Sequence, residues 1–259
     1  MRDSLYTGTG AQIQAIQFDY RRSSDQDAAR PVRDPIVVVG AGPVGLSLAI
    51  DLAQRGQRVL LLDNDNKLST GSRAICFAKR TLEIWDRLGV GDPMVAKGVS
   101  WKVGKVFFRN ELLYQFDLLP EPGHERPAFI NLQQYYAEAY LVARAMELPN
   151  LEIRWRHGVC AVEQAGDKVM LGIDTPEGRY TVEADYVAAC DGSRSAVRQL
   201  MGLESKGRVF RDRFLIADVR MKGHAWATQK LPVSEDGGQP ARGTATGAEP
   251  ERWFWFDPP

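Results

Sequence analysis

The chain has 259 residues, of which 44% are hydrophobic and 25% charged, a composition typical of globular proteins rather than of disordered or fibrous ones. Its 33 Lys and Arg residues balance its 33 Asp and Glu residues, which argues against a protein that coats nucleic acid. Because the charges balance, we expect no nucleic-acid partner. No apolar run is long enough to cross a bilayer, so we also expect no membrane span.

The cysteine pattern bears on the cellular compartment. Cys76, Cys160 and Cys190 are too few and too scattered for a disulfide framework. The polar N-terminus also lacks the apolar core of a secretory signal. We therefore expect a cytoplasmic protein in a reducing environment. The three histidines lie far apart without the spacing of zinc ligands, so we expect no metal site.

The first predicted elements form a strand, helix, strand unit. Residues 1–34 are polar and mixed in charge, and we expect a flexible leader there. Residues 36–39 are a β-branched run typical of a buried parallel strand. A glycine cluster follows, and then apolar residues at helical spacing predict a helix. Residues 58–62 form the second buried strand, which completes a βαβ start.

Further along the chain, helices alternate with hairpins. A helix at 78–88 comes first. The next predicted elements are a hairpin of strands 106–108 and 112–116, a helix from Leu132 to Met146, a strand at 151–155, a hairpin of strands 168–174 and 179–183, and a short strand at 186–190. In strand 151–155 apolar residues alternate with Glu152 and Arg154, which predicts a half-buried strand with both charges on its wet face.

The last part of the chain has a different character. We expect strands at 214–219 and 253–256. Between them, residues 222–251 are rich in Gly, Ala, Thr and Pro and lack periodicity, which predicts an exposed loop or insertion.

The strongest local signal is the glycine motif that follows strand 36–39. It consists of Gly40, Ala41, Gly42, Pro43, Val44 and Gly45. In this context, Gly40 permits a tight turn, Gly42 lets a pyrophosphate approach the backbone, and Gly45 lets the helix pack closely on the strand. The helix N-terminus then offers free N–H groups to the phosphates. The alternative is a strand, turn and helix without a ligand.

Asp63 stands where an acidic residue complements this motif. It follows the second buried strand, at the place where a carboxylate can accept hydrogen bonds from ribose hydroxyls. Together these residues indicate a dinucleotide that contains ADP. They leave NAD, NADP and FAD open, although an acid at position 63 disfavours a 2′-phosphate.

A set of motifs in a fixed order carries a family resemblance. They are the glycine motif, the turn Ser72-Arg73-Ala74, the helix residues Arg80-Thr81-Leu82-Glu83 with Leu88-Gly89, and the stretch 191–198 (DGSRSAVR). In this order, over about residues 35–220, the chain resembles the single-component FAD-dependent aromatic hydroxylases of the p-hydroxybenzoate hydroxylase group. Within that group it is most similar to the 3-(3-hydroxyphenyl)propionate hydroxylase-like members.

The resemblance implies roles for particular residues. The glycines would hold the FAD pyrophosphate, Asp63 the adenosine ribose, and Arg73 the diphosphate or ribitol side. Gln134 would contact FAD from the middle helix. The alternatives are a surface arginine for Arg73 and, for Gln134, a capping box in which Asn131 is the N-cap.

The DGSRSAVR stretch has a functional and a structural interpretation. In the family, the residues that correspond to Asp191 and Gly192 help to organise FAD and the path of the nicotinamide. The alternative is a plain turn in which Asp191 caps a short helix that begins at Ser193.

The resemblance also implies an architecture of the mixed α/β class. We expect a Rossmann-like FAD-binding domain of the glutathione-reductase type at 35–98 and 125–202. It would be interrupted by a β-rich substrate domain at 99–124 and 203–259. The second FAD motif of the family, a Gly-Asp followed by Ala and His, does not occur in this chain. We therefore expect an N-terminal portion of a longer enzyme, with the substrate domain incomplete at its C-terminal end.

The implied function is a monooxygenase that hydroxylates a small phenolic substrate with FAD, NAD(P)H and O2. A homodimer is compatible with it. No Ser/His/Asp or Cys/His set is evident, which agrees with chemistry that the cofactor performs. Three alternatives stay open: a flavin enzyme of the same fold with a non-aromatic substrate, a flavin-free NAD dehydrogenase, and an inactive FAD-binding remnant.

Overall fold

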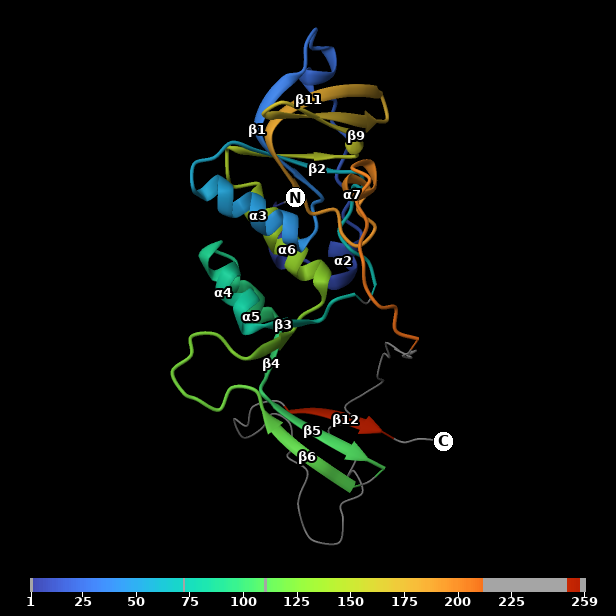
Figure 1. Ribbon diagram of the computed structural model, residues 1–259. Helices are drawn as coiled ribbons and strands as arrows, with labels where there is room; N and C mark the ends of the chain where they lie inside the picture. The colour runs from blue at the N-terminus through green and yellow to red at the C-terminus, as the bar shows by residue number, and fades with distance from the viewer. Residues whose placement is uncertain (1, 72, 110, 212–250, 257–259) are drawn as a thin grey trace. The chain divides into compact units, whose positions relative to one another are not determined.

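The computed structural model describes residues 2–71, 73–109, 111–211 and 251–256 (Figure 1). They fall into two units. Unit 1 holds Met1–Arg73, Ile84–Met94 and Gln133–Val209, and unit 2 holds Ala74–Glu83, Val95–Leu132 and Phe210–Pro259. The strand expected at 214–219 and nearly all of the loop expected at 222–251 lie outside the described residues. The domain boundaries expected from the sequence stay a prediction.

A six-stranded sheet forms the centre of unit 1, with the strand order β8-β2-β1-β11-β10-β9. The strands are β1 (Val32–Val39), β2 (Val59–Asp63), β8 (Leu151–Trp155), β9 (Gly158–Ala165), β10 (Lys168–Thr175) and β11 (Gly178–Ala189). Strands β8, β2, β1 and β11 are parallel, whereas β10 and β9 continue the sheet in antiparallel pairing. The runs of Val and Leu in β1 and β2 fit this arrangement because central parallel strands are covered on both faces.

Strand β11 belongs to both halves of the sheet. Its first half pairs with β10 in a hairpin, and its residues 182–189 pair with 32–39 of β1. The sequence predicts two separate strands at 179–183 and 186–190, and that prediction is wrong, because one strand of 12 residues spans both. The parallel pairing therefore leads straight into Cys190 and Asp191.

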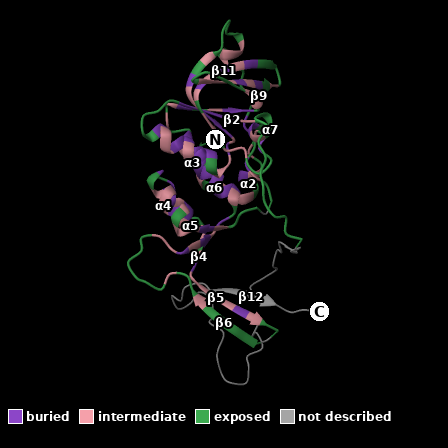
Figure 2. Ribbon diagram, viewed as in Figure 1, coloured by how far each residue is buried: buried purple, intermediate pink, exposed green. Residues whose placement is uncertain are grey.

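Helices cover one face of the parallel strands, and side chains on the other face form a buried cluster with the antiparallel end of the sheet. The helices α3 (Pro43–Gln54) and α6 (Gln134–Ala145) pack against each other, and α3 also packs on β1 and β2 (Figure 1). On the other face, Val37, Val39, Leu60 and Leu62 share a buried cluster with apolar residues of β10 and β11. Buried residues accordingly concentrate in β2 and α6 (Figure 2).

The start of α6 differs from the predicted capping box. The helix begins at Gln134, its N-cap is Gln133, and no side chain caps it within the described residues. Asn131 instead ends strand β7 (Phe129–Asn131), where its Oδ1 accepts hydrogen bonds from Trp101 Nε1 at 3.0 Å and Cys76 Sγ at 3.3 Å. The Asn131 side chain is thus occupied within unit 2, and the capping-box prediction is wrong.

Residues 2–27 are folded, so the expectation of a flexible leader is wrong for this part of the chain. They contain α1 (Arg2–Thr7), α2 (Gly10–Gln14) and the 3-10 helix η1 (Ser24–Asp27). The side chains of Leu5 and Ile13 are fully buried, and both α1 and α2 pack against α6. Single apolar anchors between polar residues produce no periodic signal, which is why the sequence pattern did not reveal this packing.

Strand β8 carries a buried cation that the alternating pattern placed in solvent. Arg154 is buried, and its NH1 lies 2.6 Å from Oδ2 of Asp25 and 3.1 Å from the hydroxyl of Tyr180. Its Nε also donates to Glu152, which keeps most of its own side chain in solvent. A buried guanidinium is tolerated when such partners satisfy it.

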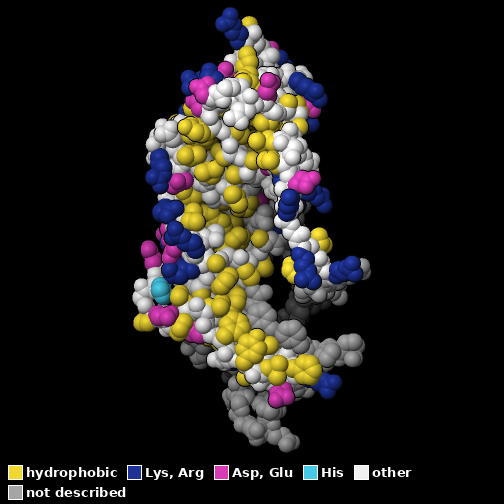
Figure 3. Space-filling view, in the orientation of Figure 1, with side chains coloured by type: hydrophobic (Ala, Val, Ile, Leu, Met, Phe, Trp, Pro, Cys, Tyr) yellow, Lys and Arg dark blue, Asp and Glu magenta, His cyan; other side chains and the backbone are white. Residues whose placement is uncertain are grey.

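Unit 2 contains two three-stranded sheets. One has the order β12 (Glu251–Phe256), β5 (Val103–Phe108), β6 (Glu111–Asp117), and the other has the order β3 (Cys76–Ala78), β7, β4 (Val99–Trp101). The predicted hairpin is present as β5–β6. Its surface is apolar, with exposed Leu112, Leu113 and Tyr114 (Figure 3). The helices α4 (Lys79–Arg87) and α5 (Gly91–Lys97) each contain residues of both units.

The central sheet allows a prediction about stability. Leu61 of β2 is fully buried, so Leu61→Ala should lower the free energy of unfolding by about 2–5 kcal/mol through lost burial and a residual cavity. Met146→Ala, at a side chain that is 50% exposed, should change it by less than about 0.5 kcal/mol. Urea unfolding measures both values. Equal effects of the two substitutions would contradict the placement of β2 in the core.

Candidate cofactor site at the edge of the central sheet

Three neighbouring parallel strands end at one edge of the sheet and bring the main sequence motifs together. In the register, Val39 of β1 lies opposite Leu62 of β2 and opposite Ala189 of β11. The Gly40 amide donates to Leu62 O at 2.7 Å, and the Cys190 amide donates to Val39 O at 2.8 Å. The glycine loop therefore lies between Asp63 on one side and Asp191 on the other. Ligands of open α/β sheets gather at this kind of edge.

Gly40 and Gly45 are required by close backbone contacts. Gly40 has φ 103°, and a Cβ on it would lie 2.5 Å from Cys190 O. A Cβ on Gly45 would lie 1.9 Å from Gly40 O. Both positions therefore exclude any side chain, as the motif predicts. The contact at Gly40 also joins the glycine loop directly to the segment that carries Asp191.

Gly42 differs from the other two glycines because space lies open around it. Its φ of −76° and ψ of 179° suit any residue, and a Cβ on it would meet no described atom within 4 Å. It is the N-cap of α3, and no side chain of the described residues caps this helix end. Pro43 follows at the first helical position, and Val44 is 70% exposed. The open backbone and the positive end of α3 fit a phosphate group.

Asp63 fastens the glycine loop to the segment that follows β2. Its Oδ2 accepts from the Ala41 amide at 2.6 Å, and its Oδ1 accepts from the Asp65 amide at 2.7 Å. Burial raises the pKa of the Asp63 carboxyl, while these two hydrogen bonds oppose that rise. Each carboxylate oxygen has a second lone pair, so the residue can still accept from a ribose hydroxyl. The bond to Ala41 is a role that the sequence did not indicate.

Asp191 acts on the other side of the loop as the anchor of a short helix. Its Oδ2 accepts from the Val197 amide at 3.0 Å, in helix α7 (Ala196–Leu200). Burial alone would raise the pKa of Asp191, but hydrogen bonds from Ser195 and from backbone amides outweigh it and lower the pKa. The helix begins after Ser195 and not at Ser193, so the predicted start is wrong. The N-cap of α7 is Ser195, whose Oγ accepts from the Arg198 amide at 3.0 Å, so the prediction that Asp191 is the cap is wrong. Gly192 has a φ of 82° in the turn that precedes the helix.

Gln134 reaches the segment after Asp63 through Glu138, a residue whose role the sequence analysis missed. Gln134 Nε2 donates to Glu138 Oε1 at 2.7 Å, and Glu138 Oε2 accepts from the Ser69 amide at 2.6 Å. Glu138 is only 4% exposed, and Ser69 Oγ is buried without a hydrogen-bond partner within the described residues. The spacing of four between Gln134 and Glu138 was the available signal.

Arg73 is the predicted site residue that the structure does not place at the glycine loop. It is exposed at the last position of its segment in unit 1. Its role toward FAD stays a prediction.

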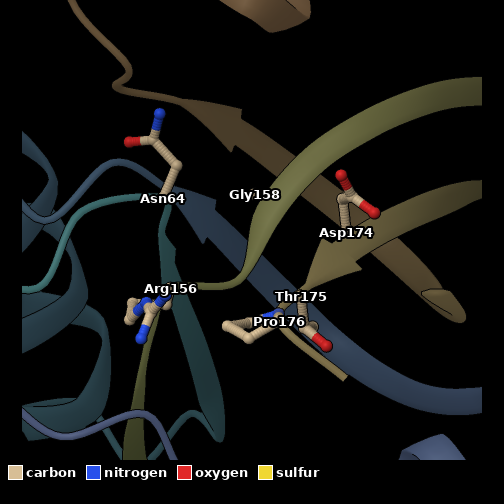
Figure 4. A pocket seen from close by; sticks show the side chains of 6 residues that line it. All are labelled: Asn64, Arg156, Gly158, Asp174, Thr175 and Pro176. Atoms are coloured by element: carbon tan, nitrogen blue, oxygen red, sulfur yellow. The ribbon is translucent and has the colours of Figure 1, made fainter. Parts of the chain in front are cut away.

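A pocket of about 310 Å³ lies at the residue that follows Asp63 (Figure 4). Asn64, the residue after Asp63, and Arg156, the residue after β8, contribute to its wall. The other lining residues are Gly158, Asp174, Thr175 and Pro176. Arg156 has a φ of 62°, unusual for a residue with a side chain, and its amide donates to Asp65 O at 3.1 Å. The segment after β2 thus also forms part of this wall.

The part of the chain that the structure describes shows neither a metal-binding group nor a membrane-spanning helix. No group of three or more His, Cys, Asp or Glu residues within it could hold a metal ion. Among the same residues, no helix is long and apolar enough to cross a membrane.

Substitutions at Gly42, which has open space around it, and at Gly45, which is closely packed, should differ in their effect on stability. Gly45→Ala should lower the melting temperature of the apo protein because its Cβ collides with the Gly40 carbonyl. Gly42→Ala should leave that temperature nearly unchanged, since its Cβ meets open space. Thermal unfolding followed by circular dichroism compares the two. A larger loss for Gly42→Ala would contradict the geometry of the loop.

Several known proteins resemble this chain in sequence. The family model described as FAD binding domain matches residues 33–238. The chain is 33% identical over 204 residues to a 12-dehydrotetracycline 5-monooxygenase/anhydrotetracycline 6-monooxygenase of Streptomyces rimosus, covering 79% of this chain and 38% of that protein. It is 31% identical over 212 residues to a 3-(3-hydroxy-phenyl)propionate/3-hydroxycinnamic acid hydroxylase of Mycobacterium sp. strain JLS, covering 80% and 35%.

A solved structure shows the same fold. The crystal structure of p-nitrophenol 4-monooxygenase from Pseudomonas putida DLL-E4 matches with a TM-score of 0.65 and 33% identity, covering 70% of this chain and 46% of that one. The chain spans little more than a third of the length of the two curated relatives above. The resemblance to aromatic hydroxylases and the mixed α/β fold class are confirmed. The chain belongs to the FAD binding domain family, among relatives that are flavin-dependent aromatic monooxygenases.

Proposed function

We propose that FAD binds along the edge formed by the ends of β2, β1 and β11. The residues present fit its ADP half, because an open glycine and an uncapped helix end suit a pyrophosphate. Gly42 and the first amides of α3 would hold the phosphates, and Asp63 would accept from the ribose. The single observation that carries this proposal is the close approach of Gly40 to Cys190, which brings the glycine motif and the DGSRSAVR stretch together at one place.

The other predicted residues would position this edge rather than react. Asp63 fixes the loop through Ala41, so the ribose acceptor and the phosphate loop are set relative to each other before FAD arrives. Asp191 holds α7 in the same way and leaves the Gly192 turn exposed at the edge. Gln134 acts through Glu138 on the Ser69 amide. Such preformed contacts reduce the ordering cost of binding.

The intact protein would be a monooxygenase that hydroxylates a phenolic ring with NAD(P)H and O2. The bound flavin would supply the redox chemistry and the activation of oxygen, and the protein would supply binding, orientation and exclusion of water. The names of the relatives support this class: two at 31–33% identity are hydroxylases or monooxygenases of phenolic or polycyclic aromatic compounds. Burial and the nearby Asp191 raise the pKa of the Cys190 thiol, which disfavours the thiolate that a nucleophile needs.

The location and assembly are also proposals. Three free cysteines without a disulfide among them fit the reducing cytoplasm. A homodimer stays a prediction, and light scattering of the intact protein measures its mass directly.

Substituting Gly42 tests the FAD site. Gly42→Val should leave the fold intact, because φ and ψ suit valine and its Cβ faces open space, but the isopropyl group would occupy the place of the pyrophosphate. We expect the purified intact variant to contain no flavin and to bind none in a titration of flavin fluorescence.

Gly207→Val is the matched control, because Gly207 is exposed and also has open space around its Cβ position. It should bind FAD like the wild type. Full flavin content in Gly42→Val would overturn the assignment of the phosphate loop.

Oxidation of NAD(P)H tests the reaction. The intact holoenzyme should oxidise NADH or NADPH faster when a phenol is added, and the hydroxylated product should appear by mass spectrometry with one oxygen atom from labelled O2. The phenols to use are 3-(3-hydroxyphenyl)propionate, p-nitrophenol and anhydrotetracycline, which sample the relatives' substrates. Bound FAD without any phenol-dependent product would favour a flavin enzyme with a non-aromatic substrate.

A further inference from the structure

Residues 2–27 form a folded segment that the family model does not cover, since its match begins at residue 33. We name this segment the N-terminal brace. Its anchors are Leu5 and Ile13, both fully buried, and Phe18, which stacks on Trp155 with ring centroids 4.3 Å apart. Burial of large apolar side chains holds such a segment on the core. The brace is therefore held on unit 1 along its length.

The brace contacts the segment that leads from Asp63 toward Arg73. The amide of Phe18 donates to Asn66 O at 2.7 Å, and Gln17 forms an isolated β-bridge with Lys67. Farther along, Gln14 Oε1 accepts from the Gly71 amide at 2.9 Å. Together with the bond between Ser69 and Glu138, these contacts restrain the backbone that directly follows the proposed ribose ligand.

The far end of the brace is clamped on the sheet through His157. This ring is 1% exposed, its Nε2 lies 3.2 Å from Arg21 O, and its Nδ1 lies 2.9 Å from the Tyr180 hydroxyl. A carbonyl only accepts, so Nε2 carries the hydrogen, and Nδ1 of the neutral ring accepts from Tyr180. The oxygen of Tyr180 accepts in turn from Arg154, which also pairs with Asp25 of the brace. Every group is satisfied while His157 is neutral.

A proton on His157 would disturb this clamp. Both ring nitrogens would then be donors: Nε2 would keep its bond to Arg21 O, but Nδ1 could no longer accept from the Tyr180 hydroxyl, which would lose its acceptor. The cationic Arg154 lies beside the same hydroxyl. The backbone of His157 also belongs to the site, because its amide donates to Asp63 O at 2.8 Å.

We propose that the N-terminal brace is a positioning element for the FAD adenosine, and that its clamp through Tyr180 and Arg154 is complete only while His157 is neutral. Protonating His157 would loosen the brace, free the segment after Asp63 and weaken FAD binding. The proposal rests on the proposed FAD site. It adds a role for residues that lie outside the glycine loop and outside the place of the flavin ring.

The surroundings of His157 set the direction of the pH effect. Burial lowers the pKa of His157, the bond to Arg21 O opposes this, Arg154 lowers it further, and Glu152 and Asp25 raise it. The other titratable groups facing the ring are Tyr20, which stacks on it, and Tyr180. With the folded pKa below the unfolded value of about 6.5, the unfolded state binds more protons. The clamp is therefore complete above about pH 6.5 and is lost as the pH falls through the folded pKa.

Two variants of the intact apo protein test the proposal by FAD titration, with the dissociation constant read from flavin fluorescence. Gln14→Ala removes the acceptor of the Gly71 amide and should raise the dissociation constant by about three- to tenfold at pH 8. Gln164→Ala, at an exposed position of β9, is the matched control and should have no effect. Equal affinities of Gln14→Ala and the wild type would overturn the brace as a positioning element.

The pH profile tests the clamp. The wild-type dissociation constant should rise between pH 8 and pH 5, whereas His157→Gln, whose amide can donate and accept without titrating, should show a smaller rise. Comparing the two profiles removes the contribution of Asp63, which both share. Parallel profiles would overturn the clamp. If His157→Gln melts at a much lower temperature, hydrogen exchange of residues 64–71 in the wild-type apo protein replaces this comparison. After correction for the pH dependence of the intrinsic exchange rate, these residues must exchange faster as the pH falls.

These outcomes separate the two proposals. A wild type that binds no FAD at any pH would overturn the proposed function, and the brace with it. If the wild type binds FAD, but Gln14→Ala binds it equally well and His157→Gln has the same pH profile, the proposal for the brace is overturned and the proposed function stands.

Discussion

The parallel pairing of β1 with both β2 and β11 is the constraint on which the site depends. Because all three strands run in one direction, their carboxyl ends open on one edge, and the segments that follow them must meet there. The register is tight enough that a Cβ on Gly40 would strike the Cys190 carbonyl. Residues that are far apart in the sequence thereby become neighbours, and the glycine motif acquires its two flanking carboxylates, Asp63 and Asp191.

Contacts within the chain shape this edge of the sheet, and each residue contributes in a different way. Gly45 lets α3 approach the strand, and Gly42 leaves its open end accessible. Asp63 contributes charge and also holds the Ala41 amide, so it is both an expected ligand and part of the scaffold. Contacts from outside the glycine motif, among them Glu138 and Gln14, then restrain the backbone between Asp63 and Arg73. The proposed binding surface thus extends well beyond the glycine motif.

How far the sequence predicts this arrangement depends on the kind of signal each residue leaves. The glycine motif, Asp63 and the strands beside them follow from local patterns, and the structure places them as those patterns require. The folded brace was missed because Leu5, Ile13 and Phe18 are isolated anchors, whose burial depends on partners far along the chain. The burial of Arg154 was missed for the same reason, since its partners Asp25 and Tyr180 come from other elements. The capping box failed because Asn131 has partners in unit 2.

Hydrogen–deuterium exchange of the intact protein, with and without FAD, tests the central claim most directly. If FAD lies along the shared edge of β2, β1 and β11, its addition should slow exchange in peptides covering residues 40–46, 63–71 and 191–197, while β9 and the exposed side of β10 stay unchanged. Protection confined to other segments, or bound FAD that protects only one of the three, would contradict a cofactor site built from these strand ends.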